Sequence, residues 1–200
     1  MMKPNLFYEK KLGGIALGVD EVGRGCVAGA VVAAGVILND QVDVTEINDS
    51  KKLSANKREK IYSQLINQCI YATAYCSVEE IEKLNILQAS LLAMRRVIAK
   101  IQQQHQFDHV LVDGNISPDI AMNNITTIIG GDGKSLSIAA ASIVAKVTRD
   151  KMMEQLDKEF PQYQWKQNKG YCTAQHSRAI REHGICVHHR RSFLKNIIPQ

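Results

Sequence analysis

The stretch IALGVDEVGRGCVAGAVVAAGVIL, residues 15–38, contains two apolar runs separated by a glycine-rich turn. The first run ends in the acidic pair Asp20 and Glu21, and residues 30–38 are apolar and rich in valine. Apolar, β-branched runs bounded by glycines are typical of strands, and a turn between two of them joins neighbouring strands. This stretch therefore predicts the first two strands of a sheet, with carboxylates at the end of the first.

Strand and helix patterns continue after this stretch. Ser54 is placed to cap a helix that runs to about residue 68. Residues 69–78 alternate in polarity and are rich in Tyr, Thr and Ala, which predicts a third strand. Apolar residues recur at helical spacing over residues 84–101, which predicts one amphipathic helix there.

The middle of the chain alternates between strands and helices. Residues 109–113 and 125–129 predict two more strands, and a long helix is expected to begin near Ser135. Three consecutive strands followed by strands that alternate with helices are typical of an α/β fold with a mixed sheet. The sequence therefore predicts a mixed β-sheet flanked by helices.

Toward the C-terminus the periodic pattern weakens. Residues 162–170 are polar and loop-like, and residues 174–182 favour a short helix. A basic tail, residues 188–191, closes the chain, and His188 with His189 is a candidate for a surface loop. We expect one domain over residues 1–200, in which roughly residues 161–200 form a loop and a small helical C-terminal segment.

The composition is that of an ordinary soluble globular chain. Of 200 residues, 45% are hydrophobic and 22% are charged, which excludes the disordered and collagen-like classes. No apolar run approaches the roughly 20 residues that a bilayer requires, and the N-terminus shows no secretory signal, so we expect a cytoplasmic protein without membrane contact. The five cysteines contain no CxxC pair and are expected to be reduced. The net charge of +5 permits a polyanionic partner.

Three apolar segments end in acid: Asp20 with Glu21, then Asp113, then Asp132. A single Asp after a strand is usually a turn former or a helix cap. Three in one chain are less easily explained in this way, because adjacent parallel strands gather such residues at one sheet edge. Four carboxylates repel one another unless basic side chains, raised pKa values or divalent metal relieve them. Hard oxygen ligands favour Mg²⁺ or Mn²⁺, and two ions about 3.5–4 Å apart can clamp an in-line phosphoryl displacement.

Two short motifs resemble nucleotide-binding signatures, but the sequence around each does not fit. Residues 23–28 fit the G-x-G-x-x-G/A fingerprint of dinucleotide-binding proteins, but a helix must follow that fingerprint and here a strand pattern follows. The acids Asp20 and Glu21 would also repel a pyrophosphate. Residues 133–135, Gly-Lys-Ser, resemble the end of a P-loop, but the first glycine of that motif would fall at Ile128, inside a predicted strand. Both nucleotide-binding interpretations are therefore disfavoured.

An ordered set of motifs resembles type 2 ribonuclease H, the ribonuclease HII family. The blocks keep the family's order and span nearly the whole chain, which makes the resemblance highly specific. They are DEVGRG at 20–25, DSKKLS at 49–54, VDGN at 112–115, GD at 131–132, AAASIVAKVTRD at 139–150, GY at 170–171 and HRRSF at 189–193.

The resemblance implies a ribonuclease-H-like fold and a metal-dependent endoribonuclease. Such an enzyme cleaves the RNA strand of RNA–DNA hybrids and also cuts 5′ to a single ribonucleotide embedded in duplex DNA, leaving 5′-phosphate and 3′-hydroxyl ends. By the resemblance, two Mg²⁺ or Mn²⁺ ions serve as cofactors in the active complex. The metal-binding catalytic residues of the family carry over to Asp20, Glu21, Asp113 and Asp132.

The resemblance also implies residues that bind the substrate. Gly23, Arg24 and Gly25 are expected to read the ribose 2′-hydroxyl, because glycines let the backbone approach a sugar closely. Tyr171 is expected to pack on the sugar at the RNA-to-DNA junction, so the C-terminal segment would contribute to binding. The family usually has proline after this tyrosine, whereas here Cys172 follows, which puts the rigidity of that loop in doubt. The alternative for the glycine-arginine-glycine turn is a purely structural hairpin turn, and the alternative for Tyr171 is a partly buried aromatic ring without a role in binding.

Basic residues are further candidates for contacts with phosphates, although charged faces are more often merely solvated. Lys51 is the first of them, and the others are Lys52, Lys146, Arg149, Arg190 and Arg191. The expected partners are an RNA–DNA hybrid and DNA duplex containing ribonucleotides, acted on by a monomer. A contact with a replication clamp is compatible with the sequence, but no convincing peptide motif stands at the tail.

Two other functions compete with this interpretation. A ribonuclease-H-like junction resolvase would lack both the glycine-arginine-glycine turn and the tyrosine loop. A binding module without chemistry would gain nothing from four carboxylates placed against a phosphate backbone. Both alternatives are therefore less consistent with the motifs than a ribonuclease.

Overall fold

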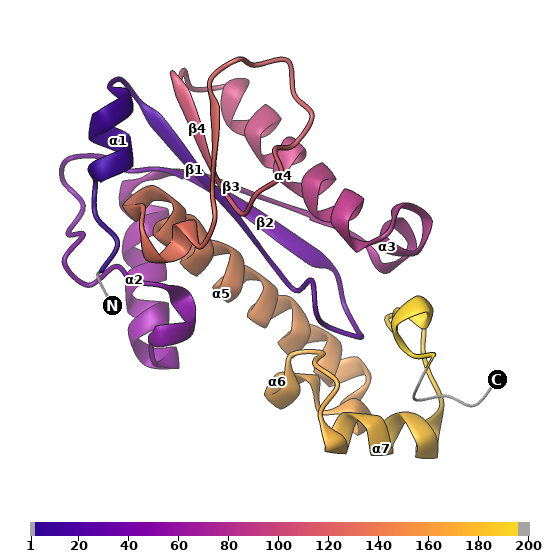
Figure 1. Cartoon of the computed structure of the whole chain (residues 1–200). Coiled ribbons are helices and arrows are strands. Elements are labelled where there is room, and N and C mark those ends of the chain that lie inside the picture. The colour runs from indigo at the N-terminus through magenta and orange to yellow at the C-terminus, as the bar shows by residue number, and fades with distance from the viewer. Residues whose placement is uncertain (1–2, 196–200) are drawn as a thin grey trace.

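The computed structural model describes residues 3–195 and is built around one five-stranded sheet with strand order β3-β2-β1-β4-β5 (Figure 1). β1 pairs antiparallel with β2 and parallel with β4, so the sheet is mixed, as the sequence predicts. The remaining pairs are antiparallel β2–β3 and parallel β4–β5. The strands are β1 (Ala16–Val22), β2 (Val31–Ile37), β3 (Ile70–Cys76), β4 (His109–Asp113) and β5 (Ile125–Ile128).

Helices cover both faces of the sheet. α4 packs on one face, and α5 with α2 packs on the other (Figure 1). Alternate side chains of β2 serve the two faces, with Val31 and Ala33 toward α4, and Ala34 and Val36 toward α5. The helices are α1 (Phe7–Leu12), α2 (Ala55–Gln68), α3 (Val78–Leu84), α4 (Ile86–Gln102), α5 (Leu136–Glu159), α6 (Trp165–Asn168) and α7 (Ala174–His183).

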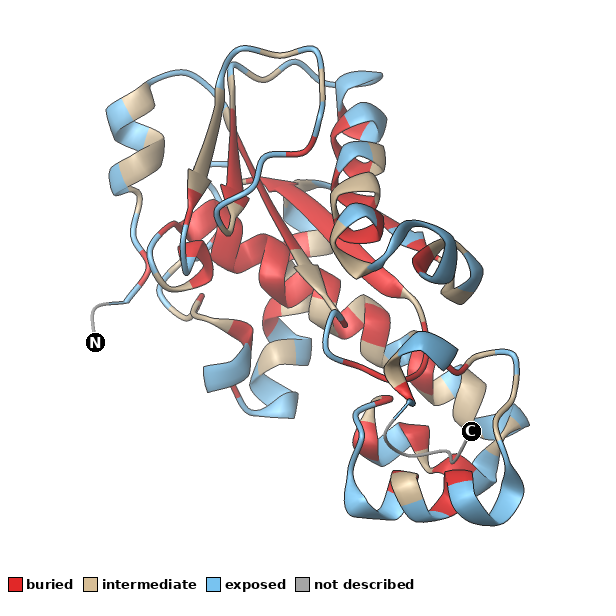
Figure 2. Cartoon of the chain, turned by 45° about the vertical axis from the view of Figure 1, so that its right-hand side comes forward, coloured by how far each residue is buried: buried red, intermediate tan, exposed pale blue. Residues whose placement is uncertain are grey.

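The N-terminal half of α5 is the most deeply buried helix segment, as the red ribbon in Figure 2 shows. Ser135 caps it, with its side chain accepting a hydrogen bond from the Ile138 N–H, which confirms the predicted start. Gly18 of β1 lets this helix lie directly on the sheet, because a Cβ there would stand 2.2 Å from the backbone carbon of Ser137. The helix is therefore fixed across the strand that carries the first two acids.

The predicted amphipathic helix over residues 84–101 is confirmed as α4, although it begins at Ile86, because Asn85 separates it from a further helix, α3, that the sequence analysis did not predict. Asn85 adopts φ 68°, outside the helical region, and its side chain caps α4 by accepting from the N–H groups of Leu87 and Gln88. α3 begins earlier, at a capping box in which Ser77 and Glu80 bond each other's backbone N–H groups. The apolar spacing continues through the break, so periodicity alone does not detect it.

The C-terminal segment has its own hydrophobic cluster, which the loop-like pattern of residues 162–170 did not predict. Trp165 is fully buried, and its ring stacks on Tyr163 with centroids 5.0 Å apart. Val27, Ala28 and Met153 complete the contact, so the cluster joins the β1–β2 connection to α5. Short 3₁₀ turns at Pro161–Tyr163 and Arg191–Phe193 frame it. The predicted surface position is wrong for His189, which is buried, whereas His188 is partly exposed.

Two further expectations concern membrane spans and thiols. Across residues 3–195, none of the helices combines the length and apolar character needed to span a bilayer. All five cysteines are free thiols, as expected. Cys26 and Cys76 are buried, and Cys172 is exposed.

Candidate active site

The sheet brings the predicted acids to one edge. Val19 of β1 pairs with Val112 of β4, so Asp20 and Asp113, each one residue further along, lie side by side. Asp113 pairs in turn with Ile128 of β5, and the 3₁₀ turn Gly131–Gly133 that follows this strand carries Asp132. Parallel strands end at the same edge, which is why residues more than ninety positions apart meet here.

Burial and mutual repulsion shift the ionisation of these carboxyl groups. Burial, together with the charges of Glu21 and Asp113, raises the pKa of Asp20 well above its usual range. Burial also raises the pKa of Glu21, although Arg24 opposes the shift. The pKa of Asp113 is raised by burial and by the charge of Asp132. The acids therefore form one electrostatically connected cluster that is short of positive charge.

Each carboxylate accepts a hydrogen bond from a protein donor. Two of the donors are backbone N–H groups and two are basic side chains. The bonds are Glu21 N–H to Asp20 Oδ1 at 2.7 Å, Arg24 Nη1 to Glu21 Oε1 at 3.3 Å, Gly131 N–H to Asp113 Oδ1 at 2.6 Å and Lys51 Nζ to Asp132 Oδ2 at 3.1 Å. Lys51 and Arg24 thus supply cationic charge at this edge of the sheet.

The donor set suits a hard divalent cation. With the side chains in these positions, no three His, Cys, Asp or Glu residues within 3–195 converge as a ready-made metal cage. The four carboxylates nevertheless offer only oxygen ligands, the type that Mg²⁺ and Mn²⁺ prefer. The Lys51 side chain is 78% exposed and can leave Asp132 with little loss of packing. An added divalent charge would favour the ionised carboxylates, which burial and mutual repulsion disfavour.

The glycine-arginine-glycine turn lies beside these acids. The Cys26 N–H donates to the Gly23 carbonyl at 3.4 Å and closes the turn, while Arg24 and Gly25 are exposed. The connection from β1 to β2 spans residues 23–30, so it is longer than the tight hairpin turn that would be a purely structural explanation. Gly23 adopts φ +99°, a conformation that favours glycine.

Tyr171 is brought against the same connection. The Gly170 carbonyl accepts from the N–H groups of Val27 at 2.9 Å and Ala28 at 3.3 Å. A Cβ on Gly170 would stand 2.5 Å from the Ala28 oxygen, so this contact requires glycine. The Tyr171 side chain is 47% exposed, which leaves part of its ring available to a ligand. Burial of the remainder, with Cys26 nearby, raises the pKa of the Tyr171 hydroxyl.

The Tyr171 loop is held by hydrogen bonds despite Cys172 in the place of proline. The Tyr171 N–H donates to the Asn168 carbonyl at 2.9 Å, and its carbonyl lies 2.9 Å from His176 Nδ1. The Cys172 thiol lies 3.2 Å from the Ser177 hydroxyl. These contacts are not predictable from the sequence, because His176 stands in a polar helix whose pattern predicts exposure although the residue is buried.

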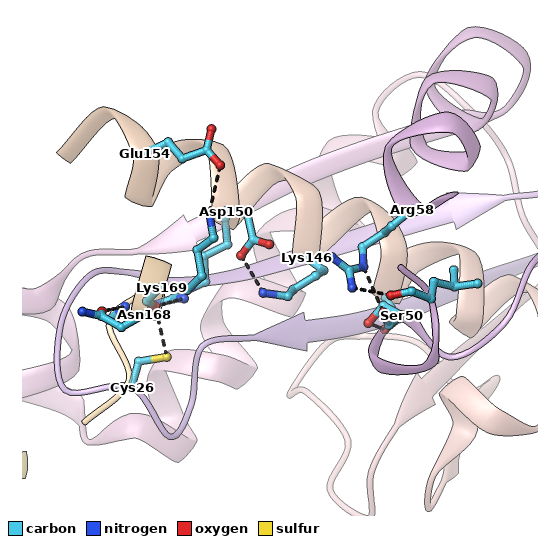
Figure 3. Close-up of polar contacts among 12 residues, drawn as sticks. Cys26, Ser50, Arg58, Lys146, Asp150, Glu154, Asn168 and Lys169 are labelled. Atoms are coloured by element: carbon cyan, nitrogen blue, oxygen red, sulfur yellow. Dashed lines mark hydrogen bonds and ion pairs between the residues drawn. The ribbon is translucent and has the colours of Figure 1, made fainter. Parts of the chain in front are cut away.

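Several basic residues proposed for phosphate contacts have other partners. Lys146 pairs with Asp150 at 2.6 Å on α5 (Figure 3). Arg149 and Arg190 are 1% and 0% exposed, so neither can touch a phosphate on the surface. Lys51 instead stands over the acids, on a turn anchored by Ser50, whose carbonyl accepts from Arg58 Nε at 2.9 Å (Figure 3). The prediction of phosphate contacts by Arg149 and Arg190 is therefore wrong.

The comparisons with known proteins agree with this geometry. Residues 17–196 match the family model described as Ribonuclease HII. The chain belongs to the ribonuclease HII family. It is 48% identical over 194 residues to a ribonuclease HII of Wolbachia pipientis subsp. Culex pipiens, covering 96% of this chain and 97% of the relative. A ribonuclease HII of Rickettsia conorii is 48% identical over 189 residues, covering 94% and 96%.

Solved structures share the fold. The ribonuclease HII in the PCNA complex from Archaeoglobus fulgidus is 26% identical, with a TM-score of 0.73 and coverage of 88% of this chain and 94% of that chain. A Bst-RNase HIII in complex with Mn²⁺ is 19% identical, with a TM-score of 0.74 and coverage of 91% and 67%. The predicted ribonuclease-H-like fold is confirmed. As a member of the ribonuclease HII family, the chain is a ribonuclease H, an endoribonuclease of RNA–DNA hybrids.

Proposed function

We propose that this enzyme also incises duplex DNA 5′ to a single embedded ribonucleotide, leaving 5′-phosphate and 3′-hydroxyl ends, with two divalent cations as cofactors. One observation carries the proposal: four carboxylates, of which Asp20 and Asp132 are buried and the other two half-buried, lie next to a turn whose Arg24 and Gly25 are exposed. The cluster supplies the place for hydrolysis, and the turn supplies a means to find one ribose among deoxyriboses.

In this proposal Asp20, Glu21, Asp113 and Asp132 hold the cations. Bound Mg²⁺ or Mn²⁺ would supply Lewis-acid charge at the phosphate that is cut. The chain itself fixes the ligands, since Asp20 and Asp113 sit on adjacent strands and the Gly131 N–H holds Asp113. Lys51 stands at the rim, where its ammonium group can neutralise a substrate phosphate once it leaves Asp132. The Mn²⁺ complex of the ribonuclease HIII neighbour is consistent with this assignment.

Recognition of the ribonucleotide is assigned to the turn and to the C-terminal segment. The 2′-hydroxyl distinguishes RNA from DNA and is displayed in the minor groove. The exposed Gly25 brings bare backbone to this hydroxyl, the buried Gly23 shapes the turn beneath it, and the Arg24 side chain, 51% exposed, can reach a phosphate. The half-exposed ring of Tyr171 packs on the neighbouring deoxyribose. We propose that residues 161–195 join substrate binding through this ring.

A replication clamp is a further proposed partner. The ribonuclease HII of Archaeoglobus fulgidus was solved in a complex with PCNA. Any contact made through the C-terminal tail of this chain lies outside the described residues, which end at Lys195. A pull-down of the full chain with a purified sliding clamp, compared with the chain cut after residue 195, tests the contact.

The decisive test of the proposed function is digestion of an end-labelled DNA duplex that carries one ribonucleotide. We expect one cut on its 5′ side with Mg²⁺ or Mn²⁺ and none with a chelator. The product ends are checked by ligation to an adjacent strand, which requires the 3′-hydroxyl and 5′-phosphate. An RNA–DNA hybrid is the positive control and the all-DNA duplex the negative one. Cleavage of the hybrid with no cut at the single ribonucleotide would reject the proposed incision of duplex DNA.

The raised pKa values predict how stability responds to pH and to metal. A carboxyl group whose pKa is higher in the folded state binds protons more tightly there, so folding stability falls as pH rises above about 4. Mg²⁺ opposes this loss by binding the ionised cluster of the folded state. We therefore expect Mg²⁺ to raise the melting temperature at about pH 7.5 and much less at about pH 5, where protons compete.

Asp20→Asn provides the internal check of that prediction, because it removes the acid with the strongest burial. We expect the variant to melt higher than the wild type without metal at neutral pH and to respond less to Mg²⁺. Each kcal/mol of relief corresponds to about 2–4 °C for a chain of this size. Asp40→Asn, an exposed acid at the opposite end of the sheet, should change neither quantity. An unchanged melting temperature across the Mg²⁺ titration would contradict a preformed acidic cluster.

A further inference from the structure

Two guanidinium groups lie buried side by side beneath the glycine-arginine-glycine turn. Arg149 lies on α5 and is 1% exposed. Arg190 directly precedes the 3₁₀ turn Arg191–Phe193 and is 0% exposed. Neither forms an ion pair with a carboxylate of residues 3–195. Buried charges without acidic partners are costly, so this pair requires an explanation.

Both guanidinium groups donate only to backbone carbonyls, and these belong to two segments. Five of the six bonds reach the β1–β2 connection and one reaches the residue before Gly170. They run from Arg149 to Ala30 at 2.9 Å, Ala28 at 3.0 Å and Lys169 at 2.8 Å, and from Arg190 to Gly29 at 2.8 and 3.0 Å and Arg24 at 3.1 Å. The pair therefore ties the turn to the Tyr171 loop.

The segments are joined at other points, which makes the assembly one unit. The Cys26 thiol reaches the Lys169 carbonyl at 3.6 Å, and Lys169 Nζ pairs with Glu154 of α5 at 2.8 Å (Figure 3). The Arg190 N–H donates to the Val27 carbonyl at 2.8 Å. The backbone under the turn is thus fixed from both sides, so the direction of each of its peptide groups is fixed as well.

The bond from Arg190 to the Arg24 carbonyl determines where the Gly25 N–H points. A trans peptide is planar, and its C=O and N–H groups point in opposite directions. The Arg24 carbonyl points inward at the buried guanidinium, so the Gly25 N–H on the same peptide points outward. Gly25 is exposed, and within residues 3–195 its N–H donates to no acceptor. This donor is left available to a ligand on the surface.

We propose that Arg190 is a specificity-determining positioning residue, which aims the Gly25 N–H at the ribose 2′-hydroxyl by holding the Arg24 carbonyl. The inference rests on the proposed reading of ribose by this turn. Arg149 supports the other end, because a Cβ on Gly23 would stand 2.3 Å from its Nε. Arg190 acts through the backbone and touches no substrate.

A guanidinium group suits this task better than an ammonium group. Its rigid fork reaches the Gly29 and Arg24 carbonyls together, whereas lysine offers one compact charge on a flexible stem. Burial and the neighbouring Arg149 lower the pKa of Arg190 to about 10, so the group stays charged at neutral pH. Hydrogen bonds from a charged donor are the stronger kind, which favours a fixed carbonyl direction.

The test compares Arg190→Lys with the parent chain in binding, with Asp113→Asn present in both to prevent cleavage. The probes are a DNA duplex with one ribonucleotide and the same duplex made of DNA alone. We expect Arg190→Lys to reduce the preference for the ribonucleotide about tenfold, because roughly one hydrogen bond is lost. Its affinity for the all-DNA duplex should stay within about twofold of the parent's. Arg95→Lys, which makes the same change at an exposed position of α4 away from the turn and the Tyr171 loop, should retain the preference.

The outcomes separate this inference from the proposed function. If the parent chain shows no preference for the ribonucleotide, the proposed reading of ribose fails. If the parent shows the preference and Arg190→Lys keeps it, the positioning role fails while the proposed function stands. Equal weakening on both duplexes would also overturn the inference, because Arg190 would then only maintain the fold.

A second variant covers the case in which Arg190→Lys does not fold. Cys26 follows the turn directly, so a synthetic peptide of residues 1–25 can be ligated to the remainder of the chain at that cysteine. Glycolic acid in place of Gly25 exchanges the N–H for an ester oxygen and leaves the side-chain space unchanged. The ester chain is expected to lose the same preference as Arg190→Lys, relative to a ligated chain with the natural amide. An ester chain that keeps the preference would overturn the inference.

Discussion

Replacing Asp113 with asparagine is expected to slow cleavage by at least about 10³-fold while binding to the hybrid persists. Asp113 lies between Asp20 on the adjacent strand and Asp132 after β5. Its charge therefore interacts with the carboxylates on both sides of it. A cation held by the carboxylates supplies several kcal/mol of charge stabilisation, and each 1.36 kcal/mol lost is about tenfold in rate.

The same substitution is expected to leave the fold intact. The asparagine carbonyl can still accept the Gly131 N–H, which Asp113 Oδ1 accepts at 2.6 Å. Removing a negative charge also reduces the repulsion that raises the neighbouring pKa values, so the melting temperature should not fall. Loss of rate without loss of stability would identify the effect as chemical.

Single-turnover cleavage and fluorescence anisotropy with a labelled hybrid measure the two quantities. Asp40→Asn is the matched control, since it makes the same change at an exposed acid remote from the cluster. Near-normal turnover by Asp113→Asn would reject its assignment as a metal ligand. Weak binding with a lowered melting temperature would instead assign it to the fold.

The position of the acids was predictable because it depends on short local patterns. Asp20 and Asp113 each end an apolar run, and strand pairing alone carries them to one edge. Two of the three strands involved pair in parallel with β4, which the alternation of strands and helices already indicated. Their catalytic role stays a prediction.

The buried arginines show what sequence patterns cannot reveal. Arg149 and Arg190 are predicted to be exposed, because lysines and arginines usually are, and Asp150, the acid next to Arg149 in the sequence, pairs with Lys146. All but one of their hydrogen bonds reach carbonyls of a connection more than a hundred residues away, and any residue type carries a carbonyl. Contacts of side chains with a distant backbone leave no trace in composition or spacing.

The hydrophobic cluster of the C-terminal segment was not predicted, for a related reason. α6 has four residues, too few for helical periodicity to appear. Trp165 and Tyr163 stand among polar residues, and the surface that buries them comes from Val27, Ala28 and Met153. The absence of α3 from the predicted elements has a different reason, because the Ser77 and Glu80 spacing is a recognisable capping signal for the start of that helix.

Gly23→Ala is expected to disable recognition of the ribonucleotide and to destabilise the chain. The residue adopts φ +99°, which an L side chain rarely takes, and its Cβ would stand 2.3 Å from Arg149 Nε. Arg149 cannot move aside easily, because its three hydrogen bonds hold Ala28, Ala30 and Lys169. Backbone strain and overpacking together should cost roughly 2–4 kcal/mol, or about 5–15 °C in melting temperature.

Gly25→Ala is the contrast within the same turn. Its φ is not in the left-handed region, and a Cβ there meets nothing within 4 Å. We therefore expect its melting temperature to stay within about 3 °C of the wild type, since no overpacking or strain is introduced. Equal destabilisation by the two substitutions would mean that the turn relaxes freely and is not fixed by Arg149.

The loss of recognition by Gly23→Ala is measured as binding preference in the Asp113→Asn background, below the melting temperature of the variant. The clash with Arg149 disturbs the conformation of the turn, so the duplex with one ribonucleotide should be bound no more tightly than the all-DNA duplex. Binding to the all-DNA duplex depends on phosphate contacts and should change little. If both duplexes lose affinity equally, the glycine serves the fold alone, and ribose must be read by another part of the chain.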